Sequence, residues 1–202
     1  MPSVSAPFGF RAESHPSGRT NASNAYQIAS GYAVNIFSGD AVKGQDAGVI
    51  QIATSDGTRS GTAGGIRVLG IFAGVQYRDA TGKPCLFPYW LGGTTATDVV
   101  AYVYDDVETR FEVQYTNPGT PGTTSVQTAV FEQCDWTGFS GTGGSIQTGQ
   151  SSSYLGAIES SGTGQFQIIG FSGDVNQSLT DAYVIARVRI NEHAYKAETP
   201  SI

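Results

Sequence analysis

The sequence is poor in the residues on which nucleic-acid interfaces, membrane spans and secretory leaders depend. Lysine occurs only as Lys43, Lys83 and Lys196, and the formal net charge is −6. A chain with so few cations has no basic stripe for phosphate contacts, so we expect no nucleic-acid binding. No apolar run reaches the roughly 20 residues that a bilayer-spanning helix needs, so we expect no membrane association. The first ten residues, MPSVSAPFGF, lack both the basic region and the apolar core of a secretory signal.

Cysteine is equally scarce. Cys85 and Cys134 lie 49 positions apart and form neither a Cys-x-x-Cys motif nor a spacing typical of zinc ligands. We interpret them as two buried thiols in a protein made in the cytosol, with a disulfide as the alternative. We expect no metal and no cofactor.

Glycine, by contrast, is abundant, with 27 copies in 202 residues, and serine and threonine are plentiful. This profile is typical of many short strands joined by turns. We predict an all-β fold, an antiparallel β-sandwich, jelly-roll-like or barrel domain. The length suits one domain with arms. The predicted boundaries are an extended N-terminal arm over residues 1–24, a single β-rich domain over 25–191 and a polar C-terminal tail over 192–202.

The segment 66–106 is the centre of this prediction, as three strands joined by two turns. Residues 66–77 are almost continuously apolar, which indicates a strand covered on both faces. Gly70 and Gly74 within it mark a bulge, a bend or the close approach of another backbone. Pro84 and Pro88 restrict the next extended stretch to a sheet edge or a wide loop.

Other segments have clear or partial strand patterns. Residues 109–115 alternate cleanly, which predicts a half-exposed antiparallel strand with its apolar side chains inward. Further strands are predicted over 48–54, 151–158, 165–171 and 182–190. Residues 25–37 fit a broken strand or a hairpin that turns at Ser30 and Gly31. Residues 126–131 fit a short helix or a strand, and 135–149 a loop held by Trp136 and Phe139.

The N-terminal arm contains two aromatic residues that would be wasted in water. They belong to the run Pro7, Phe8, Gly9, Phe10 and Arg11. Either the phenylalanines fold back on their own domain, or they anchor the arm on a neighbouring subunit. On the second interpretation the contact residues are Pro7, Phe8, Phe10 and Arg11, and deleting residues 1–17 weakens attachment to the neighbour but leaves the domain folded.

Catalytic patterns are weak. His15 lies in the predicted arm and His193 in the tail, and neither stands beside a nucleophile turn. Asp105 and Asp106, with Glu108 nearby, are the densest acidic cluster, and we interpret them as a solvated strand end and not as a glycosidase pair. A weaker hypothesis is a calcium-binding loop, with Asp174, Asn176 and Asp181 as candidate ligands. Another is an aromatic site for a carbohydrate or peptide, with the candidate residues Tyr77, Tyr89, Trp90, Tyr102 and Tyr104. We therefore expect no enzymatic activity.

Several motifs taken in order resemble a known family. They are APFGFRAESHPSG, YQIASGYAVNIFSGDAVK, IRVLGIFAGVQYRDATGKPCLFPYW, VVAYVYDDVETRFEVQ, GSIQTGQSS and ARVRINEHAY, and together they span most of the chain. The sequence is similar to the small structural head decoration, or cement, proteins of tailed bacteriophages.

This resemblance implies a β-rich protein on the outer capsid surface of the virion, made in the host cytoplasm. Its partner is the major capsid protein, and it is often a homotrimer at local three-fold positions. The resemblance carries over no catalytic residue. Alternatives are another virion component, such as a tail, fibre or head-spike protein, and a carbohydrate-binding β-domain.

Overall fold

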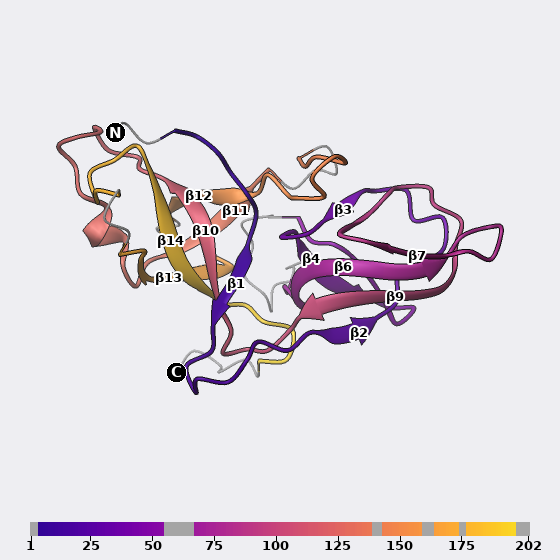
Figure 1. Ribbon diagram of the computed structural model, residues 1–202. Coiled ribbons are helices and arrows are strands. Elements are labelled where there is room, and N and C mark those ends of the chain that lie inside the picture. Colours follow the sequence, from indigo (N-terminus) through magenta and orange to yellow (C-terminus); the bar gives the residue numbers. More distant parts are fainter. Residues whose placement is uncertain (1–3, 55–66, 139–142, 159–163, 174–176, 197–202) are drawn as a thin grey trace.

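The protein is an all-β molecule with two lobes, as Figure 1 shows for the computed structural model. The structure describes residues 4–54, 67–138, 143–158, 164–173 and 177–196. One helical turn, η1 (Val126–Ala129), is the only helix in these ranges. The predicted all-β class is confirmed, and within the described residues no helix is long and apolar enough to cross a membrane.

The first lobe, here called the barrel lobe, is a six-stranded sheet in the order β1-β10-β12-β11-β13-β14. Strand β10 also pairs with β14, which closes β10, β12, β11, β13 and β14 into a ring, with β1 attached to β10. All pairs are antiparallel except β10 with β12. The strands are β1 (Arg11–Ser14), β10 (Arg110–Thr116), β11 (Gln133–Thr137), β12 (Tyr154–Ile158), β13 (Phe166–Phe171) and β14 (Tyr183–Ile190).

The alternation in β10 explains how the barrel lobe fills its interior. Phe111, Val113 and Tyr115 are buried, as predicted, and β14 runs antiparallel with Phe111 opposite Val188. Gln114 differs from its predicted outward position: it is buried, because the backbone N–H of Ala6 donates to its side-chain oxygen at 2.8 Å. The N-terminal segment therefore covers the outer face of this strand.

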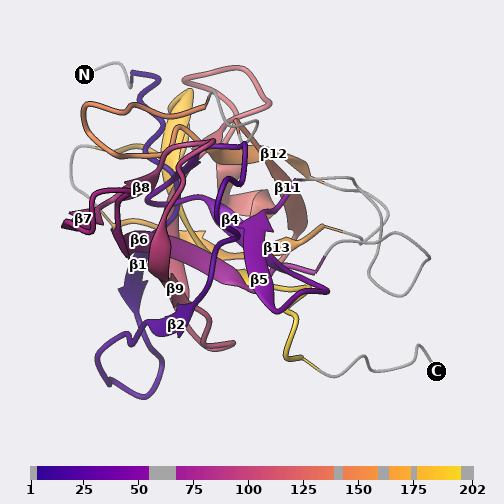
Figure 2. The same ribbon diagram turned by 90° about the vertical axis from the view of Figure 1, so that its right-hand side faces the viewer.

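The second lobe, here called the sheet lobe, contains the sheet β2-β9-β6-β4-β5, with β7 paired to the free part of β6. A separate two-stranded sheet joins β3 and β8. Figure 2 turns this lobe toward the viewer, with β7 at the left margin. The strands are β2 (Asn24–Tyr26), β3 (Ile36–Phe37), β4 (Ala41–Gln45), β5 (Val49–Ile52), β6 (Gly70–Arg78), β7 (Pro84–Phe87), β8 (Tyr89–Trp90) and β9 (Thr97–Tyr104).

From residue 67 on, the central stretch contains four strands and not the predicted three, because the extended stretch after the first turn divides into β7, which pairs with β6, and β8, which pairs with β3. Strand β6 pairs with β9 on one side, and on the other side its start pairs with β4 and its end with β7. Residues 70–75 are buried except for one half-buried position. A Cβ on Gly70 would lie 2.3 Å from the carbonyl oxygen of Tyr104, so another backbone approaches closely, as predicted. The register shifts between Phe72 and Gly74, which is the predicted bulge. Strand β7 pairs only with β6 and is an edge strand, as its prolines require.

Three local predictions are resolved or corrected. The stretch 25–37 is a broken strand and not a hairpin, because β2 pairs with β9 whereas β3 pairs with β8. Residues 126–129 are the helical turn η1, with Ser125 as its N-cap. The loop predicted over 135–149 is wrong at its start, because Asp135 and Trp136 belong to β11 and both are buried. Phe139 lies outside the described residues.

The two lobes share apolar side chains and are tied together by both ends of the chain. Ala41, Val68 and Ile71 of the sheet lobe pack with Phe10 and Phe111 of the barrel lobe. After β14, the chain returns to the sheet lobe: the N–H of Val68 donates to the carbonyl of Glu192, and the N–H of Ala194 donates to the carbonyl of Val68. The first residues of the predicted tail are thus integrated into the folded body.

Candidate functional site

The predicted contact residues at the N-terminus lie at the junction of the two lobes. In Figure 1 the indigo segment descends between the lobes and becomes β1. Pro7 and Phe8 are half-buried and Arg11 is exposed, but Phe10 is only 3% exposed. The Phe10 ring stacks on Phe166 with 4.3 Å between ring centroids and 17° between the planes. Phe10 therefore packs in its own chain, as the first of the two alternatives proposes.

Gly9 explains how the chain enters this position. Its N–H donates to the carbonyl of Ser153, and the next N–H, of Phe10, donates to the carbonyl of Gly39 at 2.9 Å. The backbone of Gly9 has φ of +75°, and a Cβ there would lie 2.7 Å from the Cβ of Ser151. Only glycine combines this conformation with this close approach. The N-terminal segment is thereby fastened to residues from both lobes.

This placement corrects the expectation that deletion of residues 1–17 leaves the domain folded. The deletion would remove Phe10 from the barrel-lobe core and strand β1 from the edge of β10. It would also expose the buried amide of Gln114, which the backbone of Ala6 now satisfies. Arg11 and the half-buried Phe8 remain available for contacts outside the chain.

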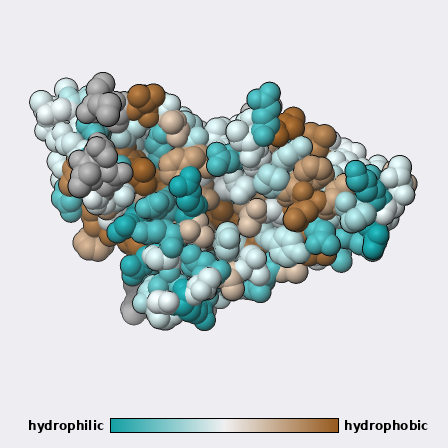
Figure 3. Space-filling view, in the orientation of Figure 1, coloured by the Kyte–Doolittle hydropathy of each residue, from teal (hydrophilic) through white to brown (hydrophobic). Residues whose placement is uncertain are grey.

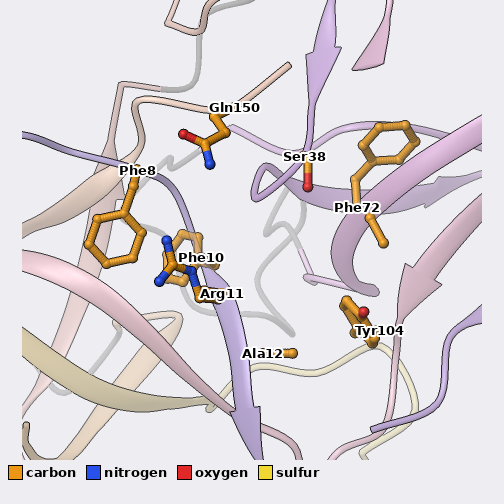
Figure 4. Close-up of a pocket in the computed structure, with 9 residues that line it drawn as sticks. Phe8, Phe10, Arg11, Ala12, Ser38, Phe72, Tyr104 and Gln150 are labelled. Carbon is orange, nitrogen blue, oxygen red and sulfur yellow. The ribbon is translucent and has the colours of Figure 1, made fainter. Parts of the chain in front are cut away.

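Phe8 and Arg11 line a pocket of about 190 Å³ between the lobes. The guanidinium carbon of Arg11 lies 4.8 Å from the centre of the Phe8 ring, which holds the cation over the aromatic face. Figure 4 shows these two side chains on one side of the pocket, facing Ser38, Phe72 and Tyr104. The space-filling view of Figure 3 is hollowed between the two lobes.

A buried carboxylate lies next to this pocket. Asp40 is 2% exposed, and its Oδ1 accepts hydrogen bonds from the hydroxyls of Ser151 (2.5 Å) and Ser153 (3.3 Å). Its Oδ2 accepts from the N–H of Phe37 at 2.8 Å. Burial raises the pKa of Asp40 to about 6, although these hydrogen bonds act in the opposite direction. The group joins a turn of the sheet lobe to the segment before β12, and sequence reasoning did not single it out.

The acidic residues at the end of β9 form more hydrogen bonds and charge contacts than predicted. Asp105 is 6% exposed and accepts hydrogen bonds from Asn24 (2.8 Å) and from the hydroxyl of Tyr26, so its interpretation as solvated is wrong. Asp106 is partly exposed and forms an ion pair with Arg19, and its Oδ1 lies 3.4 Å from the Nε2 of His15. The N–H of Glu108, and then Arg19 and the contact with His15, hold the pKa of Asp106 below its usual range.

Both histidines lie near this cluster, although they are far apart in the sequence. His193 is 1% exposed, and burial lowers its pKa. Its Nδ1 accepts a hydrogen bond from the N–H of Tyr195 at 3.0 Å, which assigns the proton of the neutral ring to Nε2. A protonated ring would lose that bond. The arrangement fixes the segment after β14 and presents no nucleophile next to a base.

The aromatic residues divide between core and surface. Trp90 is fully buried, and its indole N–H donates to the carbonyl of Tyr32 at 3.2 Å, so it offers no platform for a sugar ring. Tyr77 packs edge-on against Trp90 at 5.7 Å. At the surface, an apolar groove of about 470 Å³ lies beside the edge strand β7, lined by Ser23, Ala73, Gly74, Leu86, Phe87, Pro88 and Tyr102.

No metal site is formed in the described part of the chain, where no group of three His, Cys, Asp or Glu side chains is placed to hold an ion. Of the three candidate calcium ligands, Asp174 and Asn176 lie outside the described residues. The N–H of Ser178 donates to the carboxylate of Asp181 at 3.0 Å, which is a local turn contact.

The two cysteines are free thiols in different environments. Cys134 is fully buried in β11, as predicted, whereas Cys85 in β7 is partly exposed. We expect iodoacetamide to modify Cys85 in the native protein and Cys134 only after unfolding, because the reagent must reach the sulfur. Peptide mass spectrometry with and without denaturant would measure this. Native labelling of Cys134, or a Cys85–Cys134 disulfide, would contradict the structure.

Comparison with known proteins adds no relative. No protein-family model, no curated protein and no solved structure matches the chain.

Proposed function

We propose that this chain is a virion structural protein that decorates the outer surface of an assembled bacteriophage head and stabilises it by bridging capsid subunits. The resemblance of its ordered motifs to head decoration proteins supports the proposal. So does a surface suited to binding another protein. In this proposal the partner is the major capsid protein, the assembly on the head is a homotrimer, and the protein acts by binding, without catalysis or a cofactor.

The observation that carries the proposal is the exposed apolar surface around β7. Leu86 is 71% exposed and Phe87 is 37% exposed. Figure 3 shows hydrophobic residues gathered on the sheet lobe. Large apolar side chains clustered beside a groove are typical of a surface that a partner covers. We define this β7 surface as Leu86, Phe87, Pro88 and Tyr102.

The β7 surface is supported by rigid packing beneath it. The Phe87 ring lies 6.1 Å from Tyr77 and 5.5 Å from Tyr89, and Tyr77 packs on the buried Trp90. The edge of β7 away from β6 pairs with no other strand among the described residues. An unpaired edge offers main-chain donors and acceptors to an incoming extended segment. Side chains held in place by a core lose little entropy when a partner binds.

The mechanism follows from multivalent binding. A protein that contacts several capsid subunits at once binds the lattice far more tightly than a free subunit, because each later contact is intramolecular. Binding only to the assembled state stabilises that state by mass action. The acidic, lysine-poor composition disfavours adhesion to nucleic acid, which suits a protein on the outside of a DNA container.

Binding to undecorated, expanded heads tests the proposal. We expect saturable binding to heads and much weaker binding to free capsid subunits, measured by co-sedimentation. Leu86→Ser should weaken head binding about tenfold, because an apolar anchor of this size contributes about 1.5–3 kcal/mol when buried. The matched control is Ile146→Ser, which changes another exposed apolar residue (51% exposed) outside the β7 surface. Absence of saturable binding by the wild-type protein would contradict the proposal.

A further inference from the structure

The pocket between the lobes is lined by polar side chains that form no hydrogen bond or ion pair within the described residues. Arg11, Ser38, Tyr104 and Gln150 all line it. Within the described residues, none of their side chains forms a hydrogen bond or an ion pair, and Arg11 is engaged only by the ring of Phe8. Figure 4 shows Gln150, Ser38 and Tyr104 arranged around the space beside Arg11. Four unengaged polar groups around one cavity are the arrangement expected of a binding site.

The floor of the pocket is apolar and well fixed. Phe10 and Phe72 are 3% and 0% exposed and lie beneath the surface, whereas the half-buried Ala12 and Ala73 form the accessible apolar lining. The backbone contacts of Phe10 described above hold this wall in position. A ligand group here would have methylenes or a ring against the floor and a polar end among the four polar side chains.

The size of the pocket restricts its occupant. Cofactor and drug-sized ligand sites measure about 300–1,000 Å³, whereas a cavity of about 150 Å³ holds a benzene molecule. The volume of about 190 Å³ therefore fits one protein side chain or a single-ring molecule.

The chemistry of the lining indicates a negative group. The guanidinium of Arg11 is always charged and donates in the fork geometry that matches a carboxylate. The hydroxyls of Ser38 and Tyr104 and the amide of Gln150 can donate as well. Glu112 is the neighbour of Arg11 across the β1–β10 pair but forms no ion pair with it in the described structure. The Arg11 charge is therefore available to a ligand.

We propose that this interlobe pocket receives one carboxylate-bearing side chain, an Asp or Glu of the capsid subunit, with its methylenes against Ala12 and Ala73 and its charge on Arg11. This inference rests on the proposed function for the identity of the partner, but the carboxylate specificity of the pocket can be tested without it. The chain has a net charge of −6, so Arg11 gives a local point of attraction for an acidic group on a protein that is negative as a whole.

The first experiment uses the free protein and 4-fluorobenzoate, observed by fluorine NMR. We expect saturable binding with a dissociation constant on the order of 1 mM, the range that about ten heavy atoms allow. The neutral isostere 4-fluorobenzamide should bind at least about tenfold more weakly. Arg11→Gln should weaken benzoate binding about tenfold. The control Arg110→Gln removes the same charge from an exposed residue of β10 and should leave binding unchanged.

A second variant guards against an effect on folding. Gln150→Leu changes an exposed residue outside the strands and removes one polar group from the pocket. It should weaken benzoate binding while the proton NMR spectrum remains that of the folded protein. Equal binding of the acid and the amide, or no effect of Arg11→Gln, would overturn the pocket's carboxylate specificity whether or not the protein binds heads.

The head-binding assay then identifies the source of the carboxylate. Arg11→Gln should weaken attachment to heads about tenfold, and saturating 4-fluorobenzoate should reduce wild-type attachment. Benzoate binding together with unchanged head attachment of Arg11→Gln would overturn the assignment to a capsid side chain and leave a site for free small carboxylates. Failure of the wild-type protein to bind heads would contradict the proposed function and this partner, but not the benzoate result.

Discussion

Replacing Phe10 with alanine is expected to lower the free energy of unfolding by about 3–5 kcal/mol, the usual cost of truncating a buried phenylalanine. The ring is 3% exposed and stacks on Phe166, which itself packs edge-on against Trp136 at 5.3 Å. The truncation leaves a cavity that these two rings cannot close, because both are fixed in the barrel lobe. The loss would also remove one wall of the interlobe pocket.

Urea unfolding followed by tryptophan fluorescence measures this loss, since Trp136 reports directly on the barrel-lobe core. The matched control is Phe8→Ala, which removes the same ring two residues away. Phe8 is half-buried and touches Arg11, so its loss should lower stability by less than about 1.5 kcal/mol. Equal effects of the two substitutions would show that Phe10 is not part of the core and would restore the interpretation of residues 1–24 as a separate arm.

Stability should also depend on the charge of Asp40. The pKa of this carboxyl is raised to about 6 in the folded protein by burial, from an ordinary value of 3.8. At pH values between these two pKa values, the carboxyl of Asp40 holds its proton in the folded state but has lost it in the unfolded state. The contribution of Asp40 to stability is therefore greatest below pH 3.8 and is lost as the pH rises through 6. The difference corresponds to about 3 kcal/mol.

Comparison with Asp40→Asn isolates this effect, because all other titrating groups, including His193, are common to both proteins. Between pH 4 and pH 7, the free energy of unfolding of the wild type should fall by about 2.5 kcal/mol relative to that of Asp40→Asn. Asp46→Asn changes an exposed residue near Asp40 in sequence and should give a nearly constant difference. If the difference in unfolding free energy between wild type and Asp40→Asn stays constant with pH, or changes in the opposite direction, burial does not raise the pKa of Asp40.

Strands were predicted most accurately where their own apolar residues form a clear alternating or continuous pattern. The alternation of Phe111, Val113 and Tyr115 places β10, and the apolar run with Gly70 and Gly74 places β6 with its bulge and close backbone contact. Such patterns arise because side chains two residues apart lie on the same face of a strand, so they can be recognised without knowing which strands pair with it. The prolines around β7 likewise predict its edge position.

The sequence could not predict contacts between residues far apart in the chain. Asp40 binds Ser151 across 111 positions, and Ala6 binds Gln114 across 108 positions, with no local pattern that marks either pair. The strand β11 was missed because glycine-rich sequence follows it directly. Only Phe8 and Phe10, two aromatic residues in a polar segment, indicated that the N-terminal segment packs against something. They did not indicate which surface it packs against.

The central claim is that this molecule acts as an abundant component of an assembled particle, and counting its copies tests it most directly. If a phage encodes the chain, as the proposal holds, quantitative mass spectrometry of its purified virions, calibrated on the major capsid protein, gives the ratio of the two chains. The proposal predicts a ratio close to one decoration chain per capsid subunit, or a fixed fraction set by three-fold positions. Absence from the particle, or only a few copies each, would contradict it.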